Sequence, residues 1–114
     1  MKISDIEALD QFTCLQDTYT DVEIEAGYTS DLLSDVMAHA EEKSVLITIQ
    51  AHKNTVAVSS LAGVAAIIIC NNRPVPEDMI SAAAEEGIAV FKTAGNQFET
   101  SALIAHYLGG TSAA

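Results

Sequence analysis

The chain is best understood from one stretch, Gly27-Tyr28-Thr29-Ser30-Asp31-Leu32-Leu33-Ser34-Asp35-Val36-Met37. We interpret it as the end of a strand, a tight corner at Gly27 and a helix that begins at once. Glycine allows a turn or a close backbone approach that a side chain would block. Ser30 or Asp31 is expected to cap the helix N-terminus. Helical spacing then predicts one apolar stripe, made of Leu32, Leu33, Val36, Met37 and Ala40.

After this helix, apolar runs alternate with stretches of helical periodicity. The continuous apolar run 65–70 is typical of a central parallel strand that is covered on both faces. Asn54 and Asn96 are expected N-caps, and Gly63 and Gly87 are expected helix ends. Such strand–helix units wind right-handed and give parallel strands. The predicted strands are 45–49, 65–70 and 88–91, and the predicted helices are 55–61, 77–86 and 97–108.

The first part of the chain has a different pattern. Ser4 and Glu7 have the spacing of a capping box, which predicts a short helix to about Leu9. Strands are expected at 11–15 and at 22–25, where apolar and polar residues alternate. We expect this half to add an antiparallel edge strand. The prediction is therefore one three-layer α/β domain over 1–108, with a mixed, largely parallel sheet and helices on both faces, followed by a flexible tail at 109–114.

Composition narrows the range of partners. The 114 residues include five basic and sixteen acidic side chains, for a net charge of -11. Such a charge repels nucleic acid and anionic membranes. No apolar run approaches the roughly 18 residues of a membrane span, and the first five residues have no signal-like apolar core. Cys14 and Cys70 are isolated, which indicates buried, reduced thiols. We expect a cytoplasmic protein.

The corner and helix at 27–38, followed by Leu46-Ile47-Thr48-Ile49-Gln50 and Ala51-His52-Lys53-Asn54, resemble the DRTGG-domain family. That family is similar to the N-terminal domain of HPr kinase/phosphorylase. The resemblance covers nearly the whole chain and implies a regulatory or binding module, because members occur alone or fused to CBS nucleotide-sensing domains and to enzymes. It also implies self-association. The Asp-Arg-Thr-Gly-Gly motif itself is degraded, with Asp21 and Gly27 as its remnants.

Catalytic chemistry is not indicated by the motifs. No P-loop is present, so the resemblance does not carry over kinase activity. His39, His52 and His106 lack partners at metal-ligand spacing, and Cys70 ends an apolar strand where a thiol is usually inert. We therefore expect no catalytic residue, no metal and no cofactor. Two alternatives stay open: a small phosphoryl-transfer or hydrolytic enzyme, and a structural subunit of a larger complex such as a redox enzyme.

Asp31 and Asp35 are four residues apart and are expected on one helix face. Paired carboxylates can perform acid–base chemistry or hold Mg²⁺. Alternatively, Asp31 stabilises the helix N-terminus and Asp35 is solvated. We favour the second interpretation.

The apolar stripe of the same helix bears on assembly. Leu32, Leu33, Val36 and Met37 are more apolar surface than one short helix needs. They face either the core of the same chain or a second copy. Together with the resemblance, this leads us to expect a homodimer.

Charge placement predicts a ligand site. In α/β sheets, ligands bind outside the carboxyl ends of the parallel strands. Three of the five basic residues, Lys53, Arg73 and Lys92, follow predicted strands. We expect a phosphate-bearing ligand such as a nucleotide, with Lys53 and Arg73 on the phosphates and His52 as a further donor. The predicted ligand-binding residues are Thr29, Ser30, Gln50, His52, Lys53, Asn54, Asn71, Asn72, Arg73, Lys92 and Thr93.

Overall fold

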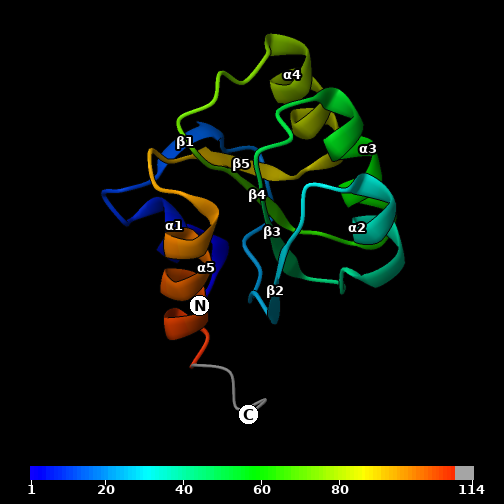
Figure 1. The fold of residues 1–114 in the computed structure, drawn as a ribbon. Coiled ribbons are helices and arrows are strands. Elements are labelled where there is room, and N and C mark those ends of the chain that lie inside the picture. Colours follow the sequence, from blue (N-terminus) through cyan, green and yellow to red (C-terminus); the bar gives the residue numbers. More distant parts are fainter. Residues whose placement is uncertain (110–114) are drawn as a thin grey trace.

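A five-stranded sheet forms the middle layer of the structure, a computed structural model that describes residues 1–109 (Figure 1). In spatial order the strands are β1 (Thr13–Gln16), β5 (Ala89–Lys92), β4 (Ala66–Ile69), β3 (Ser44–Thr48) and β2 (Ala26–Thr29). Strands β2 to β5 are parallel, and β1 pairs antiparallel with β5. The predicted α/β class, with a largely parallel sheet and an antiparallel edge strand, is confirmed.

Helices cover both faces of this sheet (Figure 1). One face carries α2 (Leu33–His39), α3 (Lys53–Ala62) and α4 (Glu77–Glu86), and the other carries α1 (Ile3–Glu7) and α5 (Gln97–Tyr107).

Two apolar cores result, because successive side chains of a strand point to opposite faces. In β3, Leu46 packs in the core under α2 to α4, whereas Val45 and Ile47 pack in the core under α1 and α5. Strand β4 is fully buried along its whole length. The prediction of an interior strand within 65–70 is therefore confirmed.

From α3 onward, the helix ends follow local sequence signals, with one exception. Gly63 and Gly87 adopt left-handed conformations (φ 81° and 69°) and end α3 and α4 as predicted. The Asn96 side chain accepts from the Glu99 N–H (2.8 Å), so the predicted cap of α5 is also confirmed. The exception is α3, because His52 is its N-cap and its Nδ1 accepts from the Asn54 N–H (3.0 Å). Asn54 therefore lies inside the helix, and its predicted capping role was wrong.

The segment 22–25 is not the strand that its alternation predicted. Its first residues pair with the N-terminus: the Ile3 N–H donates to Val22 O (3.3 Å) and the Ile24 N–H donates to Met1 O (2.8 Å). Its last residue turns to the loop before β3, where the Glu25 N–H donates to Lys43 O (2.9 Å). The strand is the next four residues, so Gly27 lies inside β2 and not at a corner. A Cβ at Gly27 would have only ordinary contacts, at 3.8 Å.

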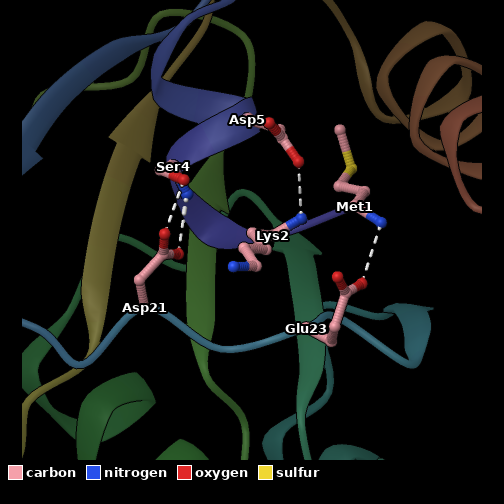
Figure 2. Close-up of polar contacts among 6 residues, drawn as sticks. All are labelled: Met1, Lys2, Ser4, Asp5, Asp21 and Glu23. Atoms are coloured by element: carbon pink, nitrogen blue, oxygen red, sulfur yellow. Dashed lines mark hydrogen bonds and ion pairs between the residues drawn. The ribbon is translucent and has the colours of Figure 1, made fainter.

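The start of α1 is held by a distant carboxylate (Figure 2). Asp21 accepts from both the Ser4 N–H (3.0 Å) and the Ser4 hydroxyl (2.6 Å). These hydrogen bonds hold the pKa of Asp21 below its usual value. The predicted Ser4–Glu7 capping box was wrong, since the helix begins at Ile3 and Glu7 instead accepts from the Tyr19 hydroxyl (2.9 Å).

Helix α2 has no side-chain cap. Its N-cap position is Leu32, and the Ser30 Oγ accepts from the Leu32 N–H (3.2 Å) just before the helix. The predicted capping by Ser30 or Asp31 was therefore wrong. The predicted stripe is also divided, because Val36 is fully buried whereas Leu32 and Met37 are 64% and 45% exposed.

Two further expectations concern the chain as a whole. The predicted tail begins at Gly109, and its remaining residues lie outside the described part of the chain. Within residues 1–109, no helix is long and apolar enough to cross a membrane.

Candidate ligand site at the carboxyl edge of the sheet

A cavity of about 410 Å³ lies between the loop after β3 and the loop after β4. The two strands are parallel neighbours, so both loops leave the sheet at the same edge. Five of the predicted ligand-binding residues meet here: Gln50, His52, Asn71, Asn72 and Arg73. The remaining lining residues are Ile49, Ala51 and Pro74.

The wall formed by Asn71 and Asn72 has an unusual backbone. Both residues have positive φ values (60° and 51°), which asparagine adopts more readily than other residues with a Cβ. The Asn71 N–H donates to Gly95 O (2.9 Å) and the Asn72 N–H donates to Thr93 O (2.8 Å). The loop after β4 is thereby tied to the loop after β5. Because these backbone donors are already used, the side-chain amides are the hydrogen-bond donors that the two residues have left for a ligand.

Donors dominate the polar lining of the cavity. Nδ1 of His52 accepts the capping hydrogen bond of α3, so the neutral ring carries its proton on Nε2 and can donate there. Arg73 is exposed and brings a guanidinium charge. Among the described residues, no carboxylate lines this cavity. In a chain of net charge -11, a site with this composition suits an anion.

Asp31 does not line the cavity, but it anchors the loop after β3 that forms one of its walls. Its Oδ1 accepts from the Thr48 hydroxyl, the Ile49 N–H and the Gln97 side-chain amide, each at 2.9 Å. Its main-chain carbonyl accepts from the Gln50 side chain (2.9 Å). Asp31 therefore joins the ends of β2 and β3 to the start of α5. Sequence reasoning missed this role, although a carboxylate directly after a strand at this edge was the available signal.

Asp31 and Asp35 do not share one helix face as expected, because α2 begins after Asp31 and the two side chains have different partners. The paired-carboxylate alternative therefore has no support, and Asp31 does not cap α2 as the favoured interpretation had it. Asp35 accepts from the Tyr28 hydroxyl (2.7 Å) and contacts Nδ1 of His39 (3.1 Å). The Tyr28 hydrogen bond is the main cause that holds the pKa of Asp35 below its usual value.

The other predicted site residues lie outside this cavity. Lys53 and Asn54 are in the first turn of α3, and Lys92 is the last residue of β5. Thr29 shares a hydrogen bond with Ser101 (2.7 Å). Thr93 lines a second cavity of about 370 Å³, together with Gln11, Phe12, Ala94, Gly95, Glu99, Thr100 and Leu103.

The two thiols are held in their protonated form. Cys70 is fully buried, and burial raises its pKa. Cys14 is half-buried rather than buried as expected, and burial together with the neighbouring Glu7 raises its pKa to about 11. At neutral pH neither thiol is a strong nucleophile. Within residues 1–109, no group of three or more His, Cys, Asp or Glu side chains is arranged to hold a metal ion.

Comparisons with known proteins agree with this architecture. Residues 16–107 match the profile of the DRTGG domain. The crystal structure of the CBS and DRTGG domains of the regulatory region of Clostridium perfringens pyrophosphatase, complexed with the activator diadenosine tetraphosphate, is similar at a TM-score of 0.60 and 18% identity. The match covers 68% of this chain and 34% of that chain, so it shows a shared fold over about a third of the larger protein. None of the curated proteins compared matches this chain.

Proposed function

Because this chain belongs to the DRTGG-domain family, we propose that it is a non-catalytic regulatory module that binds a small phosphate-bearing ligand. The cavity between the β3 and β4 loops carries this proposal. It combines one guanidinium with neutral donors, and no carboxylate lines it among the described residues. A regulatory role is supported by the similar pyrophosphatase region, which is a regulatory region crystallised with a nucleotide activator.

The proposed ligand contacts follow from the chemistry of the lining. Arg73 supplies charge-assisted hydrogen bonds to phosphate oxygens, and His52 donates through Nε2. The side-chain amides of Asn71 and Asn72 add neutral donors. A volume of about 410 Å³ is near the lower end of small-molecule sites, so it suits a phosphate-bearing group rather than a complete dinucleotide.

The test is calorimetry with pyrophosphate, tripolyphosphate and ATP, supported by thermal unfolding. A probe at 100 times its dissociation constant stabilises the fold by about 2.7 kcal/mol. Arg73→Gln should weaken binding roughly tenfold or more, because it removes charged hydrogen bonds worth about 1.5–3 kcal/mol.

Two variants with the same change in charge serve as controls. The first is Lys53→Gln, because Lys53 lies at the carboxyl edge of the sheet but does not line the cavity. The second is Lys2→Gln, because Lys2 lies beside the extended segment that precedes β2. Both should bind like the parent. If Lys53→Gln weakens binding as much as Arg73→Gln does, the cavity is not the site. If no probe binds the parent at millimolar concentration, the proposal is wrong.

The proposal also covers the oligomeric state and the cellular location of the chain. We infer a homodimer, which is supported by two exposed apolar side chains on neighbouring helices: Met37 on α2, and Leu61 on α3, whose side chain is 75% exposed. We infer a cytoplasmic location, which is supported by the presence of both cysteines as free thiols.

A further inference from the structure

Strand β2 is an open edge of the sheet. It is the last strand in the order β1-β5-β4-β3-β2, so β3 is the strand that pairs with it (Figure 1). The other edge strand, β1, has an irregular register between Cys14 and Gln16. Bulges, prolines and charged side chains usually keep an edge strand from pairing with another chain. Strand β2 has none of these, because its four residues are uncharged and pair with β3 without a register shift.

The backbone groups on the open side of β2 belong to Gly27 and Thr29. Thr29 is the register partner of Ile47, and the Ser30 N–H donates to Ile47 O (3.2 Å). Backbone groups alternate between the two sides of a strand, so Gly27 and Thr29 direct theirs away from β3. Both residues are exposed, whereas the residue between them is half-buried. Within residues 1–109, no hydrogen bond from outside the sheet reaches their N–H or C=O groups.

The glycine in the middle of β2 is not required by the fold of the single chain. Gly27 does not adopt a left-handed φ. A Cβ at this position would meet side-chain atoms of Ile104 and Val45 at 3.8 Å, which is ordinary contact. Glycine weakens a strand interior, and it often marks a place where another backbone approaches closely. Gly27 is therefore explained better by a neighbour on the open side than by packing within the chain.

Resting on the homodimer inferred above, we propose that two copies of the chain pair through β2, antiparallel about a two-fold axis at Tyr28, and join their sheets into one. Gly27 of each copy then lies opposite Thr29 of the other, so that each outward N–H meets an outward C=O. A two-fold interface needs a surface that is complementary to itself. Strand β2 qualifies in a chain of net charge -11, because none of its residues is charged.

The helix beside β2 fits the same arrangement. The Tyr28 hydroxyl donates to Asp35 of α2 (2.7 Å), so α2 lies next to β2 on one face of the sheet. Two sheets that join at β2 bring their α2 helices toward each other. Met37, which is 45% exposed, therefore lies on a helix next to the proposed interface.

The test removes an outward donor and leaves the pairing with β3 intact. Gly27→Pro lacks the N–H on the open side, and proline is tolerated in edge strands in this orientation. The variant should keep the circular dichroism and cooperative unfolding of the parent. Its dimer dissociation constant, measured by sedimentation, should rise roughly tenfold or more, because hydrogen bonds are lost on both sides of the axis. Gly27→Ala is the matched control, since it also replaces the glycine but keeps the N–H, and it should dimerise like the parent.

Amide hydrogen exchange on the parent tests the same contact without a substitution. Protection of the Thr29 N–H should increase as the protein concentration rises through the dissociation constant. The Ser30 N–H is the internal control, because it is bonded to Ile47 O within each copy and should be equally protected at every concentration. If Gly27→Pro does not fold, this measurement decides.

The results separate the β2 pairing from the homodimer on which it rests. The pairing is overturned if folded Gly27→Pro dimerises like the parent, or if exchange at Thr29 does not depend on concentration. The homodimer still stands in those cases and uses another surface. If the parent sediments as a single 12.0 kDa species at every concentration, the homodimer itself fails, and the β2 pairing fails with it.

Discussion

Ser59 is a fully buried residue of α3, and its hydroxyl has no hydrogen-bond partner among the described residues. We predict that Ser59→Ala raises the free energy of unfolding by about 1 kcal/mol, because it removes an unpaired polar group and improves helix propensity. Urea unfolding measures this. Ser60→Ala is the control, since the Ser60 hydroxyl is exposed and donates to the Glu86 carboxylate; it should not stabilise. A loss of stability in Ser59→Ala would show that its hydroxyl has a partner.

Helix α1 should be the acid-sensitive element through Asp21, whose pKa is lowered by the two hydrogen bonds from Ser4. A lowered folded-state pKa contributes stability above the ordinary value of 3.8, and this contribution disappears as the pH falls through the folded-state pKa. We predict that Asp21→Asn melts at a lower temperature than the parent at pH 6, and that the difference shrinks below about pH 3.8. Thermal unfolding across this range measures it. A difference that does not change with pH would contradict the prediction.

The same helix illustrates why the first forty residues were harder to predict than the rest. From Ser44 onward, apolar runs and glycine or asparagine punctuation are local signals, and helix 77–86 was predicted to the residue. Earlier elements depend on distant partners, such as Asp21 for α1. The site shows the same division. The two loops that line the cavity could be predicted from the ends of the apolar strands. The sequence did not reveal that His52 caps α3, so it could not show that Lys53 belongs to the helix while His52 lines the cavity.

At the scale of the whole molecule, each chain carries a net charge of -11, and the repulsion between like charges opposes association with a second copy. The exposed apolar residues Met37 and Leu61 favour it. We predict that sedimentation at micromolar concentration shows a dimer of the 12.0 kDa chain, and that added salt strengthens it by screening like charges. Leu61→Glu should shift the equilibrium toward the monomer. A single 12.0 kDa species at both low and high salt would contradict the homodimer.

The antiparallel pairing of β1 with β5 also has a consequence during synthesis. Strands β2 to β5 lie side by side in the order in which the ribosome makes them, so each new parallel strand finds its neighbour already present. The first strand has no such neighbour, because Thr13 pairs with Lys92. At about 5–20 residues per second, it waits roughly 4–16 s for its partner. During that interval the backbone of β1 lacks the strand that it pairs with, and Leu15 lacks part of the core against which it packs in the folded chain.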